Sequence, residues 1–296
     1  MADAVRSCAV PRWWRVLAVV GLVSGAFVAI AQPAAASQFT VTTVADSGAG
    51  SLRQAVLDAN ANAGPDEIVF DPSIDTQTIT LTTGALSVTE ELTVTGNGAT
   101  NTIVDGNGTD RIFIISGLGA FMISGAMLQS GVSPSGDGGA VNSDGAVTID
   151  ATVVTDNSAP SDSGGGIAAA TVTIQNGSVV RANQAGDDGG GVAATSGDVT
   201  VTDSTIGGAA PSDANTAGGG GGGVAANGGT ATITSSTVSH NTAPGNGGGV
   251  RASAVVVAGS TVSNNSNGDQ GGGIYGSDSV AVSASAITGN TAANSG

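Results

Sequence analysis

Reactive side chains are sparse in this chain of 296 residues, which has one His and seven Lys and Arg together, against 23 acidic residues. Asp187 and Asp188 form an adjacent acidic pair, and two carboxylates at a set separation are what glycoside hydrolysis requires. His240 offers a general base, and Arg181 offers the cationic base that a polysaccharide lyase needs. These four residues are the candidate catalytic residues. The acidic pair and His240 also fit solvated turns, so the pattern favours a protein that is not an enzyme.

Acidic or amide residues also recur just before clusters of glycine. Stacked units would bring their side chains near one another, and carboxylates with backbone carbonyls suit Ca²⁺. The strict spacing of calcium-binding β-rolls is missing, so hydrophilic turns are the alternative interpretation. No cofactor is otherwise predicted. The candidate calcium ligands are Asp137, Asp162, Asp188, Asn246 and Asp269.

A repeat organises the region from residue 138 onward. A glycine cluster followed by Val or Ile recurs at intervals of 24 to 32 residues. Such a period is typical of a solenoid, in which each unit buries its apolar side chains only by stacking on its neighbours. The branched residues that follow the glycines are Val141, Ile167, Val192, Val224, Val250 and Ile274.

Each unit also carries two apolar residues two positions apart, and a third about five positions later. Alternation at period two places the pair on one face of a strand, so three short strands per unit are predicted. The fold class that follows is all-β, a parallel β-helix. A β-sandwich is the alternative, but it gives no reason for identical turns to recur. The third apolar residues are Val154, Val180, Ile206, Val238, Val262 and Ile287.

An asparagine column follows these third apolar positions. Asn tolerates left-handed turns, and stacked amides can hydrogen-bond from unit to unit. The longest unit has Ala209 at this position and a six-glycine run at 218–223, so we expect a break in the column and a looped-out bulge there. The predicted structural ladder consists of Asn157, Asn183, Asn241, Asn265 and Asn290.

The segment before residue 138 is less regular. Apolar pairs such as Ile112 with Ile114, and Phe121 with Ile123, indicate earlier, irregular coils. Residues 51–60 have apolar positions at helical spacing, and Ser51 with Gln54 forms a capping-box pattern. We interpret this helix as the cap of the open amino-terminal end of the solenoid.

Residues 1–36 are typical of a signal peptide. Arginines precede an apolar run at 16–30, and Ala34-Ala35-Ala36 provides a cleavage motif before Ser37. The apolar run is shorter than the roughly 20 residues of a spanning helix, so no membrane span is expected in the mature chain. Three of the seven arginines and one of the 23 acidic residues leave with it, so the formal charge becomes −18. Such a charge disfavours binding to nucleic acid.

Two sets of motifs resemble known families. The segments 39–43, 46–48, 51–55 and 66–70 resemble the CSLREA-type amino-terminal domain of secreted bacterial right-handed parallel β-helix proteins, with Gly50 in place of the Cys. The segment 271–290 resembles the polymorphic outer-membrane protein repeat, with Val or Ile where that repeat has Phe. The resemblance implies a pectate-lyase-like right-handed solenoid on an exported protein, and adhesion is the usual suggestion for outer-membrane relatives.

Three segments are therefore expected: a signal peptide at 1–36, a cap with irregular first coils at 37–137, and regular coils at 138–296 that lack a carboxy-terminal cap. We expect a secreted or surface-located, non-enzymatic protein that acts as an adhesin or as a structural element for presentation at the surface. A polysaccharide lyase, a glycoside hydrolase or a calcium-dependent glycan-binding module is the alternative. Expected partners are surface glycans or host and cell-envelope components, and the uncapped end favours self-association.

An outward threonine column could contact sugars or order water. Threonine is also simply a good strand residue, which is the plainer interpretation. The column fails at Val256 and Ala281. It consists of Thr148, Thr173, Thr200 and Thr232.

Overall fold

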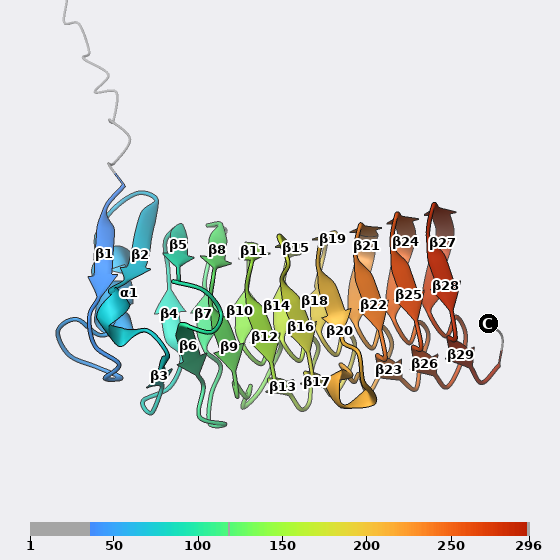
Figure 1. Cartoon of the computed structure of the whole chain (residues 1–296), viewed down its shortest axis with the longest axis horizontal. Helices are drawn as coiled ribbons and strands as arrows, with labels where there is room; N and C mark the ends of the chain where they lie inside the picture. The colour runs from blue at the N-terminus through green and yellow to red at the C-terminus, as the bar shows by residue number, and fades with distance from the viewer. Residues whose placement is uncertain (1–35, 118, 295–296) are drawn as a thin grey trace, which may run out of the picture. The chain divides into compact units, whose positions relative to one another are not determined.

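The computed structural model describes residues 36–117 and 119–294. The expected signal peptide, apart from Ala36, therefore lies outside the described residues. Within them the chain winds into stacked coils whose strands all pair in parallel in the registers observed, from Gln38 with Glu67 to Ser283 with Ala258. Figure 1 shows the coils following one another in sequence order. The predicted parallel β-helix is confirmed, because a sandwich would not stack consecutive units in register.

Each coil has three strand positions, which define three faces of the solenoid. Face 1 contains β1 (Gln38–Val41), β2 (Asp66–Phe70), β5 (Leu92–Thr95), β8 (Phe121–Ser124), β11 (Ala146–Asp150), β15 (Thr171–Gln175) and β19 (Val199–Thr202). Face 2 contains β3 (Gln77–Thr80), β6 (Thr102–Asp105), β9 (Met127–Gln129), β12 (Val153–Thr155), β16 (Val179–Arg181), β20 (Thr205–Gly207), β22 (Thr237–Ser239), β25 (Thr261–Ser263) and β28 (Ala286–Thr288). Face 3 contains β4 (Leu86–Val88), β7 (Phe113–Ile115), β10 (Val141–Ser143), β14 (Ile167–Ala169) and β18 (Val192–Ala194).

Three long strands run from face 3 into face 1 of the following coil: β21 (Val224–Thr234), β24 (Val250–Ala258) and β27 (Ile274–Ser283). Short strands lie between face 2 and face 3: β13 (Ser158–Ala159), β17 (Gln184–Ala185), β23 (Thr242–Ala243), β26 (Ser266–Asn267) and β29 (Thr291–Ala292). Two 3₁₀ helices, η1 (Pro72–Ile74) and η2 (Pro211–Asp213), lie in connections.

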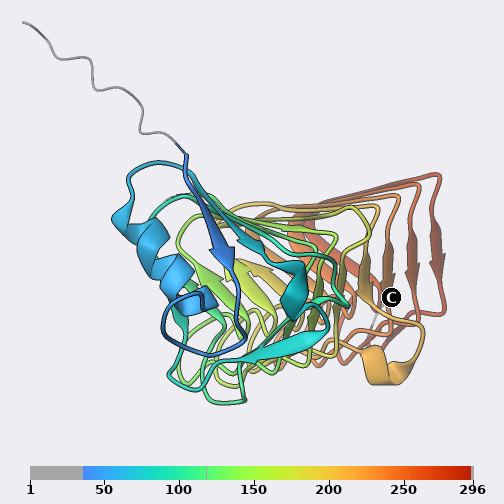
Figure 2. The same cartoon turned by 60° about the vertical axis from the view of Figure 1, so that its left-hand side comes forward.

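The predicted capping helix is α1 (Leu52–Ala61). Ser51 caps it, since the Ser51 hydroxyl accepts a hydrogen bond of 3.1 Å from the Gln54 N–H. The apolar stripe of the helix is buried against β1, β2 and β4, and Figure 2 shows α1 beside these first strands. The helix thereby covers part of the core at the amino-terminal end.

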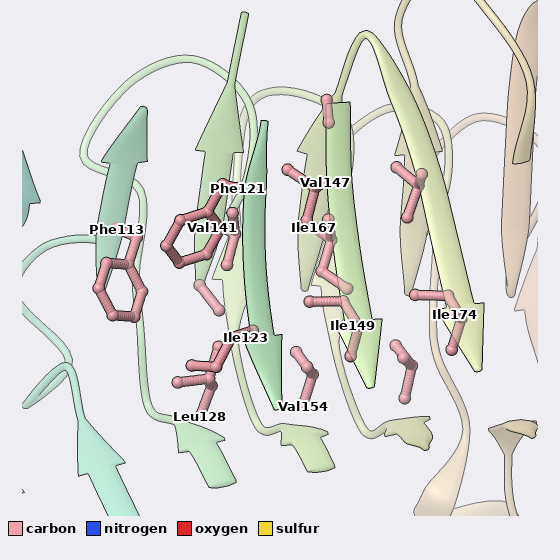
Figure 3. Close-up of a cluster of buried hydrophobic side chains, with 14 of the residues drawn as sticks. Phe113, Phe121, Ile123, Leu128, Val141, Val147, Ile149, Val154, Ile167 and Ile174 are labelled. Carbon is pink, nitrogen blue, oxygen red and sulfur yellow. The ribbon is translucent and has the colours of Figure 1, made fainter. Parts of the chain in front are cut away.

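The core is a set of inward columns of branched side chains, seen in Figure 3. Phe113 and Phe121 fill its wider amino-terminal part, with ring centroids 5.0 Å apart. The predicted pairing of Ile112 with Ile114 is wrong in register, because Phe113 and Ile115 face inward in β7 and Ile114 faces outward. Farther along the solenoid, one of the inward positions of face 3 is occupied by alanines such as Ala194. Small interior residues there let the walls of the solenoid approach one another.

The asparagine column is a continuous hydrogen-bonded ladder on the inside of one corner. In each coil the Asn N–H and Nδ2 both donate to the Oδ1 of the next Asn, as from Asn157 to Asn183 at 3.0 Å each. The predicted break at Ala209 is wrong, because residues 208–214 leave the wall as a loop and Asn215 takes the ladder position. The loop lies before the glycine run rather than within it. The ladder contains Asn157, Asn183, Asn215, Asn241, Asn265 and Asn290.

A second ladder, of hydroxyl groups, lines the corner between face 1 and face 2. Backbone N–H groups donate to the hydroxyl of the next coil, as from Ser236 to Ser260 at 3.1 Å, except at Ser178, whose N–H donates to the Gln175 carbonyl. A residue with positive φ precedes most members of both ladders, for example His240 (φ 61°) before Asn241 and Ser235 (φ 50°) before Ser236. The tight corner requires this conformation. The hydroxyl ladder contains Thr152, Ser178, Ser204, Ser236, Ser260 and Ser285.

We expect Asn215→Ala to lower the free energy of unfolding by about 2–4 kcal/mol, because buried partners on both sides lose their hydrogen bonds. Asn215 accepts from two groups of Asn183 and donates to the Val180 carbonyl. Urea denaturation measures the change. Asn142→Ala on the outside of β10 is the control and should stay within about 0.5 kcal/mol. Stabilisation by Ala209→Asn with no loss from Asn215→Ala would contradict this ladder.

An ion pair holds the loop that precedes α1. Asp46 accepts from Arg53 at 2.7 Å and from the hydroxyls of Thr82 and Thr83 at 2.9 and 2.7 Å. Burial alone would raise the pKa of Asp46, but these hydrogen bonds outweigh it and lower the pKa to about 2. Arg53 also donates to the carbonyls of Gly84 and Ala85, which ties α1 to the chain entering β4.

We therefore expect acid to weaken the cap. A carboxyl whose pKa is depressed by folding contributes stability above its unfolded pKa of about 3.9, and this is lost as the pH falls through the folded value. Thermal melts between about pH 6 and pH 2 should show a steeper loss for the wild type than for Asp46→Asn. Asp58→Asn on the exposed side of α1 should keep the wild-type slope, and equal slopes in all three proteins would refute the idea.

Candidate functional site

The structure does not bring the four catalytic candidates together. Arg181 pairs with Asp213 at 3.0 Å, and the Nδ1 of His240 lies 2.8 Å from the Gly208 carbonyl oxygen. Both partners belong to the 208–214 loop, so Arg181 and His240 hold that loop against the wall. The hydrogen bond from the Ala210 N–H, followed by that from Arg181, lowers the pKa of Asp213.

Asp187 and Asp188 lie in the turn before β18. Asp188 forms an ion pair with Arg251, two coils farther along, and also accepts from the Gly220 N–H at 2.7 Å. The Arg251 stem runs over Gly220, where an added Cβ would lie 2.7 Å from the Arg251 Cδ. The absence of a side chain at Gly220 therefore leaves room for the Arg251 side chain to pack against the backbone.

Asp187 is exposed beside this ion pair. Partial desolvation raises its pKa, and repulsion from the Asp188 carboxylate adds to the rise, while Arg251 opposes it. A carboxyl with a raised pKa suits proton transfer. Within the described residues, however, neither His240 nor Arg181 lies beside Asp187 to act as its partner. The two aspartates thus differ in environment without forming an acid–base pair with His240 or Arg181.

The candidate calcium ligands hold backbone and side-chain amides instead of facing one common point. Asp137 accepts from the Ser163 N–H at 2.8 Å, Asp162 from Gly136 at 2.9 Å and Asn246 from Gln270 at 3.1 Å. Asp269 accepts from the Asn294 side chain at 2.9 Å. In the described residues no three His, Cys, Asp or Glu side chains gather as a metal site would require. Calcium binding stays a prediction.

One open pocket gathers polar groups of different chemistry on three consecutive coils. It has a volume of about 190 Å³ and lies where β21, β24 and β27 cross from face 3 to face 1, at the right of Figure 1. Arg251 and Tyr275 are paired in register, so their outward side chains are neighbours. Asn227, Asn246, Ser253 and Ser277 complete the polar lining.

This pocket, which we call the Arg251–Tyr275 pocket, was missed by sequence reasoning. Its signal is a change in one column of the repeat. The second residue after each glycine cluster is a buried alanine at Ala168, Ala193 and Ala225, and becomes Arg251 and then Tyr275 in the next two coils. Only alignment of the units by their glycine anchors reveals it.

The outward threonines do lie in one column of face 1. Thr148, Thr173, Thr200 and Thr232 pair in register, and the column continues as Val256 and Ala281. The side chains are half-buried by their neighbours. None of these four threonines is among the residues that line the pocket.

Comparison with protein-family models, with curated proteins and with solved structures found no match for this chain. The fold itself defines the class of this protein, which is a parallel β-solenoid built from repeated coils. Across residues 36–117 and 119–294, none of the helices has the length and apolar character needed to cross a membrane.

We expect Asp187→Asn to raise the melting temperature at neutral pH. Folding disfavours the ionised form of a carboxyl with a raised pKa, so this penalty is present above its folded pKa and absent below its unfolded value of about 3.9. Melting at pH 7 and pH 3 measures it: the gain should vanish at pH 3. Asp188→Asn is the matched control and should lower the melting temperature at pH 7, because it removes the partner of Arg251.

Proposed function

We propose that this chain is a non-enzymatic, exported β-helix that binds one sugar unit of a polysaccharide in the Arg251–Tyr275 pocket. Localisation outside the cell follows from the signal-peptide motif at 1–36. The same proposal includes membership of the secreted families that the CSLREA-type and outer-membrane repeat motifs resemble.

The lining of the pocket is the observation that carries the proposal. An aromatic ring offers a flat apolar face with a polar tip, a guanidinium offers charge-assisted hydrogen bonds, and amides and hydroxyls offer both donors and acceptors. Sugars need this combination, because their C–H faces pack on rings while their hydroxyls need polar partners. The pocket is smaller than the roughly 300–1,000 Å³ of small-molecule clefts, so it suits a single unit of a chain.

Arg251 is the charged residue in the pocket lining, and we propose that it binds the carboxylate of an acidic sugar although Asp188 already pairs with it. Among the described residues, Arg251 donates to Asp188 through Nη1 alone. Its Nε and Nη2 are therefore available to bind the carboxylate of a ligand. The side chains of Arg251 and Asp188 are 35% and 15% exposed, so a ligand can reach the guanidinium. Uronate units present a carboxylate next to ring hydroxyls, which matches this arrangement.

The enzymatic alternative has less support. Arg181 and His240 each brace the inserted loop, and Asp188 is engaged by Arg251 and Gly220. Self-association through the last described coil also remains a prediction. In that coil the inward-type residues Val280, Val282 and Ile287 are 48%, 46% and 42% exposed.

A glycan array probed with the full protein tests the proposal. We expect binding to acidic polysaccharides, weakened at least about tenfold by Tyr275→Ala or by Arg251→Ala, without release of unsaturated or reducing sugars. Arg181→Ala is the matched control, because it removes an arginine outside the pocket and should leave binding unchanged. Turnover of a bound glycan, or binding that neither pocket substitution affects, would overturn the proposal.

A further inference from the structure

Ser37, next to the first strand β1, takes part in three hydrogen bonds. Its N–H donates to the Asp66 carboxylate at 2.9 Å, its carbonyl accepts from the Glu67 N–H at 2.9 Å, and its hydroxyl accepts from the Asn62 side chain at 3.2 Å. Asn62 also donates to Asp66 at 2.8 Å. The neighbouring Ala36 is exposed. A small polar cradle thus holds one particular residue at the edge of the solenoid.

Asp66 is unusual within this cradle. It is 3% exposed, and it occupies an inward position of β2, in register with the core residue Leu92. Both hydrogen bonds go to Oδ1, while Oδ2 is buried without a partner. A buried carboxylate with an unsatisfied oxygen is costly, so the site calls for a further donor or a cation.

The surrounding charged groups do not supply that cation. Glu67 points to the outside of β2, where Gln38 and Thr95 donate to it at 2.8 and 3.0 Å. Glu91, which directly precedes β5, contributes only its backbone carbonyl to the Asp66 N–H. At the carboxy-terminal end of α1 the contact is the neutral amide of the capping residue Asn62. Within the described residues, Asp66 is bonded to neutral donors alone.

The expected cleavage site lies next to this carboxylate. Hydrolysis of the peptide bond between Ala36 and Ser37 by a signal peptidase consumes one water, leaves a carboxylate on Ala36 and frees the amino group of Ser37. The nitrogen that now donates one N–H to Oδ1 becomes an ammonium with three N–H groups, at an ordinary pKa of about 7.7–8.0. The ammonium therefore has two more donors than the amide, and Oδ2 of the same carboxylate is an acceptor without a partner.

We propose that Asp66 is the built-in acceptor for the new amino terminus, so that removal of the leader completes an ion pair between the half-buried Ser37 and the buried Asp66 and stabilises the first coil. The inference rests on the export that the proposed function includes, but it is independent of sugar binding in the Arg251–Tyr275 pocket. It assigns a function to a buried charge that the solenoid does not otherwise need, and it makes Ser37 the processed end of the chain.

Amine labelling tests the proposal directly, because the sequence contains no lysine and the α-amino group is then the single primary amine of the processed protein. The exported protein is isolated, its first residue is read by mass spectrometry, and it is treated with an amine-reactive ester at pH 7. We expect Ser37 as the first residue. We expect its amino group to react at least about tenfold more slowly in the folded protein than in urea, since pairing with Asp66 keeps the ammonium protonated and partly shields it.

Asp66→Asn should abolish that protection, whereas Glu67→Gln, the adjacent outward acid, should retain it. A second comparison does not depend on how well Asp66→Asn folds: wild-type protein cut to begin at Ala36 should melt several degrees lower than protein beginning at Ser37. This difference should shrink as the pH rises through the raised pKa of the amino group, because the stabilisation is present below the unfolded pKa and lost above the folded one. A different first residue, or equal reactivity in folded and unfolded protein, would overturn the proposal.

Discussion

Each coil must satisfy the polar backbone groups that its corners turn inward, and the two ladders meet this demand. A sharp corner needs a residue with positive φ, and the residue after it points inside, where an unpaired amide would be costly. Asparagine on one corner and Ser or Thr on the other provide the partner from the next coil. Asn215 is bonded to Asn183 in the coil before it and to Asn241 in the coil after it, so its place in the wall cannot shift. Extra residues therefore have to leave the wall, as the 208–214 loop does.

The interior and corners carry the stability, which leaves the outward positions free to differ. Tight glycine turns cover the column of alanines on face 3, where a Cβ at Gly189 would lie 3.0 Å from the Ala193 Cβ. Larger residues in that column have to lean along the solenoid instead. Arg251 does so over Gly220 toward Asp188, and Tyr275 follows in the next coil. The proposed binding pocket is therefore a local departure from a regular wall.

Charge is distributed by the same logic. With four described arginines, most carboxylates have no cation nearby, and many hold backbone N–H groups of an adjacent coil, as Asp137 holds Ser163. The exceptions are informative. Asp46 and Arg53 secure the cap, Asp213 and Arg181 hold the 208–214 loop, and Asp188 and Arg251 shape the pocket. Asp66 has no cation nearby, but it differs from the other carboxylates because it is buried with one oxygen unpaired. Each of these places does something that the repeating coil does not require.

The fold was predictable from the sequence because it is periodic: the glycine anchors and alternating apolar pairs specify which residues face inward, and Ser51 with the apolar stripe specifies α1. Local pattern could not show that Asn215 rather than Ala209 stands in the ladder. The 208–214 loop separates Asn215 from β20, and the spacing seen in the other coils does not apply there. Nor could it show that Phe113 rather than Ile114 faces the core. The contacts of Asp188 with Arg251, 63 residues apart, and of Ser37 with Asp66 arise only when coils stack, because stacking joins positions that the chain itself keeps distant.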